Sequence, residues 1–328
     1  MGVGKKIKER VAESGAWRRL VARSRTENLP GFRSVSLFNT VKKFKEHVVW
    51  DDLIERASAI SFNTAMALPP MILFLCSLIP VIAKFHFIIE LNLEEQLYSL
   101  IRDIIPVSPV KDPTEKDSYT AIHDFLYNII NEPRNGLLIF SILLSVFFSS
   151  NAMMGVMRSF DKEYAGFTKR KGIRKRLTAI RITLILVFLV LLCLALLFAQ
   201  QSVLEWLGIQ NEWLAAALGK IRWALIFLLV FFIISYIYRH APAVHKKWKL
   251  ITPGSVIATC LVVVCSLAFS WWVSQFGTYN KLYGSIGTII VVLVLIFLNS
   301  LILLIGFEIN ASIYSLARTR EDKEALKD

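Results

Sequence analysis

The chain has 328 residues, of which 55% are hydrophobic and 19% are charged, with a mean hydropathy of +0.53 and a formal net charge of +13. Soluble domains contain about 45–50% apolar and about 25% charged residues, so this composition excludes an ordinary soluble protein. It also excludes disordered, collagen-like and disulfide-scaffold chains. We therefore expect a membrane protein, and the spacing of the apolar residues predicts how often it crosses the bilayer.

Six charge-free runs have about the length that a helix needs to cross a bilayer, which is about 20 residues. They predict an all-α, polytopic fold with spans at about residues 57–83, 136–157, 182–204, 223–238, 251–275 and 284–307. The fourth run is short, but an arginine flanks each end and can extend to the interface. Only Lys281 separates the last two runs, which predicts a tight hairpin.

The Lys and Arg residues distinguish the two sides of the predicted bundle. Residues 1–56 contain 13 of them, residues 158–181 contain nine and residues 239–250 contain four. Residues 85–135 contain four bases and nine acids. Because cytoplasmic loops carry the excess of Lys and Arg, both termini are predicted to be cytoplasmic. The positive charge thus indicates which side of the membrane each loop occupies, and we expect no nucleic-acid partner.

The predicted spans divide the chain into three regions. Residues 1–56 form a basic cytoplasmic arm whose stretch 37–54 has the periodicity of an amphipathic helix. That helix lies on the inner membrane surface or caps the bundle, and the sequence leaves both alternatives open. Residues 57–311 form the transmembrane domain, in which residues 85–135 are an external loop with two amphipathic interfacial helices. Residues 312–328 form a cytoplasmic tail.

The first span is polar and contains prolines. Asn63 and Thr64 precede the pair Pro69 and Pro70, and we expect the helix to break at this pair and again at Pro80. In a membrane, the carbonyls freed by a proline must be satisfied by neighbouring groups or water. Asn63, Thr64, Pro69 and Pro70 are therefore candidates for a solute path or a hinge. The alternative is a helix kink that packing tolerates.

The end of the second span adds one polar candidate and one ion pair. Asn151 follows two serines and is a further candidate for the solute path. Arg158 and Asp161 are three residues apart, a spacing that places them on one face of a helix. We expect these two side chains to form a structural ion pair at the interface.

The last hairpin is the most patterned part of the sequence. Its glycines permit a tight turn and close helix approach, and its candidate path or hinge residues are Tyr279, Tyr283, Gly284 and Gly287. Glu308 follows the final apolar run and is the last candidate. An acid at this position can bind a cation, move a proton, or pair with Arg56 or Arg181, and the structural pair is the favoured interpretation.

No catalytic signature is present in the sequence. A phosphate-binding glycine loop, a zinc-binding histidine spacing and a G-x-S-x-G elbow are all absent. We therefore expect no enzymatic activity, no metal and no cofactor.

Several of these segments together resemble the YihY/BrkB family of bacterial inner-membrane proteins, over roughly residues 45–318. The segments that carry the resemblance are 56–59 (RASA), 149–151 (SSN), 158–160 (RSF), 238–242 (YRHAP), Trp248, 253–254 (PG), 283–287 (YGSIG) and 304–311 (LIGFEINA). The chain departs from the usual pattern at Phe307, where a small residue is usual, and at Ser255, where alanine is usual.

The resemblance implies a multi-pass protein of the bacterial inner membrane in contact with membrane lipids. Members of the family have been labelled virulence factor BrkB or ribonuclease BN, and the nuclease label is a misassignment. The family is otherwise uncharacterised, with transport suspected.

Our favoured hypothesis is a transporter of a lipid-like or amphiphilic solute, because few intramembrane charges suit such a solute better than a coupled ion. The alternative is a non-transporting membrane scaffold or an envelope assembly factor, which the basic arm suggests. A membrane ribonuclease has the least support. The sequence leaves homo-oligomerisation open.

Overall fold

The computed structural model describes residues 35–82, 135–161, 167–168, 170, 172–206, 212–245, 247–275 and 277–326. Over these residues the fold is all-α, as predicted, with one isolated backbone bridge between Phe167 and Val244. The helices are α3 (Leu37–His47), α4 (Trp50–Ile82), α8 (Asn135–Phe160), α9 (Gly172–Trp206), α10 (Glu212–His240), α11 (Pro253–Gln275) and α12 (Gly277–Ala325). The predictions for residues 1–34 and for the external loop at 85–134 fall outside the described residues.

Five of these helices are long and apolar enough to cross a membrane. Their apolar stretches are Trp50–Leu75, Leu138–Phe160, Gly172–Cys193, Pro253–Val273 and Ile289–Arg320. The remaining predicted span falls in α10, whose described apolar stretch is the shorter Ala224–His240. The structure thus shows a multi-pass membrane protein, and the sixth span stays a prediction.

The amphipathic stretch before the first span forms two helices rather than one. Ser36 caps α3 by accepting a hydrogen bond from the backbone of Asn39, and the backbone at Val48 is extended after α3 ends. A new helix, α4, then begins at Trp50. Because α3 packs against α12, the structure supports the interpretation of this segment as a cap on the bundle.

The prediction that the first span breaks at its prolines is wrong. The helix α4 runs without interruption from Trp50 to Ile82, through Pro69, Pro70 and Pro80. A bilayer offers the backbone no water as an alternative partner, so a spanning helix continues past prolines that would end it in water. Extensive packing of α8 along α4 adds support to the same helix.

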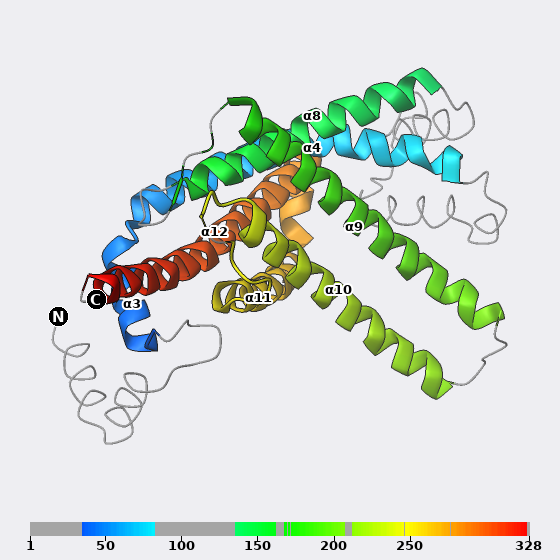
Figure 1. The fold of residues 1–328 in the computed structure, drawn as a ribbon. Coiled ribbons are helices and arrows are strands. Elements are labelled where there is room, and N and C mark those ends of the chain that lie inside the picture. The colour runs from blue at the N-terminus through cyan, green and yellow to red at the C-terminus, as the bar shows by residue number, and fades with distance from the viewer. Residues whose placement is uncertain are drawn as a thin grey trace.

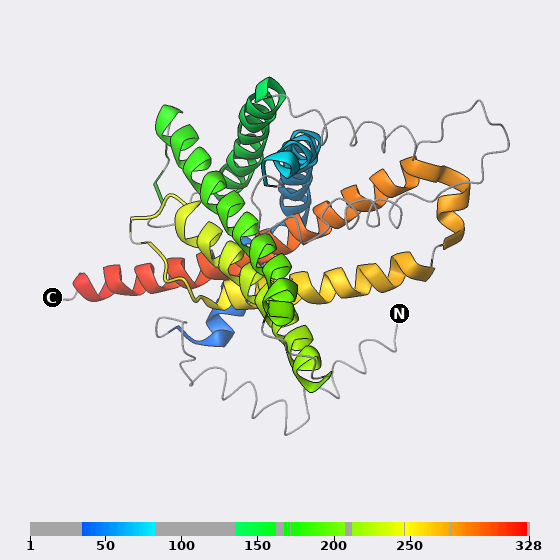
Figure 2. The same cartoon turned by 90° about the vertical axis from the view of Figure 1, so that its right-hand side faces the viewer.

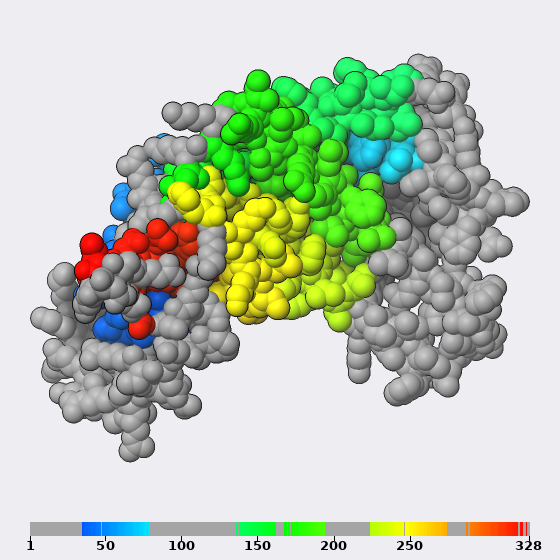
Figure 3. All heavy atoms as spheres, viewed as in Figure 1, coloured from blue at the N-terminus to red at the C-terminus, as the bar shows by residue number. Residues whose placement is uncertain are grey.

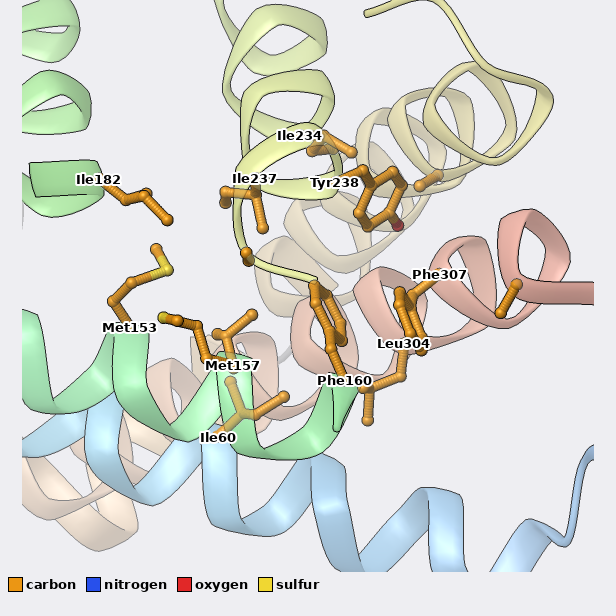
Figure 4. Packing of buried hydrophobic residues seen from close by; sticks show 14 of the residues in the cluster. Ile60, Met153, Met157, Phe160, Ile182, Ile234, Ile237, Tyr238, Leu304 and Phe307 are labelled. Atoms are coloured by element: carbon orange, nitrogen blue, oxygen red, sulfur yellow. The ribbon is translucent and has the colours of Figure 1, made fainter. Parts of the chain in front are cut away.

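The described core lies at one end of the bundle, where six helices meet (Figure 1). The ends that contribute are the N-terminal parts of α4, α9 and α11 and the C-terminal parts of α8, α10 and α12. Figure 4 shows this packing, with Met157 and Phe160 of α8 facing Leu304 and Phe307 of α12. We call this cluster the closed end.

Away from the closed end the helices diverge (Figure 1). The share of buried residues in the apolar stretches ranges from 11% in α11 to 33% in α8, so only a minority of their side chains are fully buried. Figure 2 shows α11 and α12 as a hairpin whose return helix bends sharply near its beginning.

Candidate functional site

A buried ion pair joins the first and last spanning helices at the closed end. The Nη2 atom of Arg56 on α4 lies 2.9 Å from Oε1 of Glu308 on α12. The Glu308 side chain is 0% exposed and that of Arg56 is 13% exposed. The sequence left open whether Glu308 forms an ion pair with Arg56 or with Arg181, and the structure shows the ion pair with Arg56.

The same guanidinium connects a third helix. Its Nη1 donates a 2.7 Å hydrogen bond to the carbonyl oxygen of Ser159, near the C-terminus of α8. Its Nη2 also lies 3.1 Å from Oδ2 of Asp52, one turn earlier on α4. A guanidinium suits this position because its planar set of donors can serve several acceptors at once. Arg56 therefore holds α4, α8 and α12 together.

Close backbone contact between α11 and α12 lies beside this pair. A Cβ atom added at Gly254 would lie 2.1 Å from the carbonyl oxygen of Gly306, and one added at Gly306 would lie 2.4 Å from the hydroxyl of Tyr238. Neither position has room for a side chain. The backbone N–H of Gly254 donates to Oδ1 of Asn310 at 2.9 Å, and Nδ2 of Asn310 donates to Thr252 at 2.9 Å. The two glycines thus permit the backbones of α11 and α12 to come close together, and the hydrogen bonds of Asn310 stabilise this contact.

An aromatic layer covers the ion pair and the helix crossing. The rings of Phe160 and Phe307 stack at a centroid distance of 4.0 Å, and Phe167 contacts Phe307, Trp248 and Tyr314 edge-on. Phe307 is fully buried in this layer. The layer makes the closed end apolar as well as ion-paired.

Two connecting segments cross on the outer face of this layer. The backbone N–H of Thr168 donates to the carbonyl of Ala243 at 2.7 Å. The Arg170 guanidinium donates to the carbonyls of His240, Ala241 and Pro242 at 3.0–3.2 Å. These carbonyls lie at and just beyond the C-terminus of α10, where helical partners are lacking. Burial lowers the pKa of Arg170, the largest effect, and nearby Asp161 opposes that shift.

The expected pair of Arg158 with Asp161 is not the one that forms. Asp161 pairs with Lys175 of α9, and Arg158 is exposed. The reason is that α8 ends at Phe160, so Asp161 no longer follows the helical spacing that would place it over Arg158. The pair that does form connects the end of α8 to the start of α9.

The polar candidates of the first span bond mainly to their own helix. The Nδ2 of Asn63 donates to the carbonyl of Ala59 at 2.7 Å, and the Thr64 hydroxyl donates to that of Ile60 at 2.9 Å. Asn63 also lies against Gly155 of α8, since a Cβ there would come within 3.3 Å of Asn63 Nδ2. Asn63 follows Arg56 by seven residues, so both lie on one face of α4 about 10 Å apart along its axis.

The other candidates lie in three places. Pro70 is buried and Pro69 is exposed on α4. Asn151 on α8 accepts a hydrogen bond from Arg176 of α9, whose guanidinium lies 4.9 Å from the centre of the Phe147 ring. Tyr279, Tyr283, Gly284 and Gly287 lie in the first part of α12, which starts at Gly277. The sequence analysis missed Arg170, Tyr238 and Asn310 as contacts at the closed end, although two of them stand in the segments of family resemblance.

The chemistry available at the closed end is structural pairing. Within the described residues, no group of three His, Cys, Asp or Glu side chains could hold a metal ion. The Tyr238 hydroxyl donates to the carbonyl of Leu303 at 2.7 Å, which adds one more tie between α10 and α12. The arrangement can close one side of the bundle, and it can open only by breaking ion pairs and ring contacts.

Fold and site together define an all-helical, multi-pass membrane protein. A family model described as "Virulence factor BrkB" matches residues 44–328. The chain belongs to this virulence factor BrkB family, as the resemblance in the sequence implied.

Curated relatives agree with this family. The chain is similar to a ribonuclease-like protein, YfkH of Bacillus subtilis, with 29% identity over 245 residues, 74% of this chain and 86% of that protein. It is also similar to a UPF0761 membrane protein of Vibrio campbellii, with 32% identity over 121 residues, 36% of this chain and 38% of that one. For a UPF0761 membrane protein of Tolumonas auensis the identity is 27% over 85 residues, 25% of this chain and 28% of that one. No solved structure matches the chain significantly.

Proposed function

We propose that the chain transports a lipid-like or amphiphilic solute across the bacterial inner membrane. The observation that carries this proposal is the one-ended packing of the bundle. The closed end is held by the Arg56–Glu308 pair and the aromatic layer, whereas the spanning helices diverge and stay largely unburied beyond it. A solute can enter such a bundle sideways from the bilayer, and rearrangement of the closed end would release it.

The charge inside the described bundle favours a lipidic solute over a coupled ion. Glu308 is neutralised by Arg56 in a buried pair, and Asp161 is neutralised by Lys175. A steeply coupled ion transporter needs ionisable groups that change partners along a path. The two described acids that are largely buried are thus both paired with a cation, which supports a solute that needs no charged path.

We also propose six spans with both termini cytoplasmic, in the three regions 1–56, 57–311 and 312–328. The closed end supports this topology in two ways. The C-terminal end of one helix meets the N-terminal end of the next there, as the chain of a multi-pass bundle requires. The basic residues Arg170, Lys175 and Lys247 lie at the same end. Basic residues of this kind mark the cytoplasmic side. We propose no enzymatic role, and the ribonuclease-like name of YfkH stays with that protein.

Reconstitution into liposomes tests the transport proposal. A fluorescent phospholipid is placed in both leaflets, a membrane-impermeant reductant quenches the outer one, and the loss of the protected half is followed. We expect the full-length chain to accelerate this loss and that of labelled amphiphiles. Rates equal to those of protein-free liposomes for every solute would overturn the proposal and leave the scaffold role as the better account.

A further inference from the structure

An apolar cavity of about 180 Å³ lies between α9 and α10. Its walls are Leu189, Leu192, Cys193, Leu225, Leu228, Leu229 and Phe232. An apolar cavity of about 150 Å³ is enough to bind benzene, so this one has room for a length of acyl chain. The two helices lie side by side on one face of the molecule (Figures 1 and 3).

Two buried hydroxyls lie nearer the closed end than the cavity, one on each helix. Ser235 follows Phe232 by three residues and precedes Arg239 by four, so all three share one face of α10. On α9, Thr183 precedes Leu189 by six residues, which is about 9 Å along the helix axis. Thr183 is 4% exposed and Ser235 is 1% exposed.

These polar groups lack partners in the part of the chain that the structure describes. The hydroxyls of Thr183 and Ser235 and the Nε of Arg239 are buried without a hydrogen bond to another described residue. A buried donor left unsatisfied is destabilising, so such groups call for an acceptor from outside the protein. Oxygen atoms of a ligand would supply it.

Positive charge gathers at the same end of the two helices. Lys247, Arg239 and Arg181 all lie close enough to His240 to act on it electrostatically. We call Arg181, Arg239 and Lys247, which surround the His240 ring, the cationic end of the groove. None of these three cations forms an ion pair with another described residue, so the cluster attracts an anion.

An aromatic ladder connects the cationic end to the cavity. The Phe232 ring, which lines the cavity, is stacked with Tyr236 at a centroid distance of 6.5 Å. Tyr236 in turn contacts the His240 ring at 4.2 Å. The apolar cavity, the aromatic ladder and the cations thus follow one another along α10 toward the closed end, and we call this surface the α9–α10 groove.

We propose that this α9–α10 groove binds an anionic phospholipid, with its phosphate at the cationic end and an acyl chain in the apolar cavity. Arginine side chains and hydroxyls suit phosphate oxygens as hydrogen-bond donors. Identifying the bound lipid as the transported solute rests on the proposed function, whereas the binding can be tested by itself.

The test is a lipid titration of the full-length chain in detergent, read by native mass spectrometry. The probes are phosphatidylglycerol and phosphatidylcholine with identical acyl chains, and inorganic phosphate as competitor. We expect phosphatidylglycerol to bind at least about fivefold more tightly, which corresponds to the ~1 kcal/mol that one Lys or Arg contributes toward anionic lipid. Arg239→Gln and Lys247→Gln should each remove about this preference, whereas Arg158→Gln, an exposed cation on α8, should not.

A second variant separates the two ends of the groove. Leu229→Trp should fill the cavity and weaken both lipids equally, with the apparent melting temperature kept. Equal binding of the two lipids by the wild type, or variants that change nothing, would overturn the inference. Displacement of phosphatidylglycerol by millimolar inorganic phosphate, with Leu229→Trp neutral, would show a free-phosphate site and also overturn it.

The lipid titration and the liposome assay fail in distinguishable ways. Binding as expected without any flux would overturn the proposed function and keep the groove as a lipid site. Flux that none of the groove variants alters would overturn the groove and keep transport.

Discussion

Replacing Glu308 by Gln removes the negative charge from the buried pair, while Asp52 and Ser159 still accept hydrogen bonds from the Arg56 guanidinium. Breaking a buried ion pair by losing one partner costs about 3–5 kcal/mol. Because Asp52 lies 3.1 Å from the same guanidinium and Ser159 still accepts a hydrogen bond, we expect the lower end, ~3 kcal/mol. At about 2–4 °C per kcal/mol, the melting temperature should fall by about 6–12 °C.

Thermal unfolding of the detergent-purified chain, followed by tryptophan fluorescence, measures this shift. The matched control is Asp322→Asn, which breaks the pair with Arg318 at 3.3 Å, where the two side chains are 51% and 57% exposed. Exposed pairs contribute about 0–1 kcal/mol, so this variant should melt within about 4 °C of the wild type. Equal shifts for Glu308→Gln and Asp322→Asn would refute the reasoning. The double variant Arg56→Met with Glu308→Leu should recover part of the loss, because it removes both buried charges together.

Three further substitutions test other contacts of the closed end. Gly306→Ala places a methyl 2.4 Å from the Tyr238 hydroxyl and should destabilise the chain by at least ~2 kcal/mol, whereas Gly136→Ala, with open space around it, should be neutral in the same melting assay. Arg170→Gln deprives three carbonyls at the end of α10 of their donor, and hydrogen exchange there should become faster, with exchange in α11 unchanged. Lys175→Gln should lower the melting temperature by several degrees through loss of the pair with Asp161, and a neutral result would contradict that assignment.

Much of the fold could be predicted from the sequence because bilayer thickness fixes the length of a spanning helix. The apolar runs predicted the five described helices that are long and apolar enough to cross a membrane, although several of these helices begin or end outside the predicted runs. The sequence rules fail at the prolines of α4, since rules drawn from soluble helices assume competition from water. The sequence pattern also predicted one amphipathic helix over residues 37–54, whereas the extended backbone at Val48 separates α3 from α4.

The closed end was predictable only in part. A carboxylate at the end of an apolar run requires a partner, which made Arg56 a candidate for Glu308. The choice between Arg56 and Arg181 depends on how α4 and α9 rotate against α12, and a single sequence does not give that rotation. The contact of Arg170 with carbonyls 70–72 residues later follows from no local spacing. Asp161 was assigned the wrong partner because the helix ends one residue before it.

The phospholipid flip rate per reconstituted chain, measured side by side for the wild type and for Leu229→Trp, tests the central claim most directly. We expect a wild-type rate well above that of protein-free liposomes and a Leu229→Trp rate close to the protein-free value, with both chains equally folded. A wild-type rate no higher than that of protein-free liposomes would contradict the claim that this bundle moves lipid.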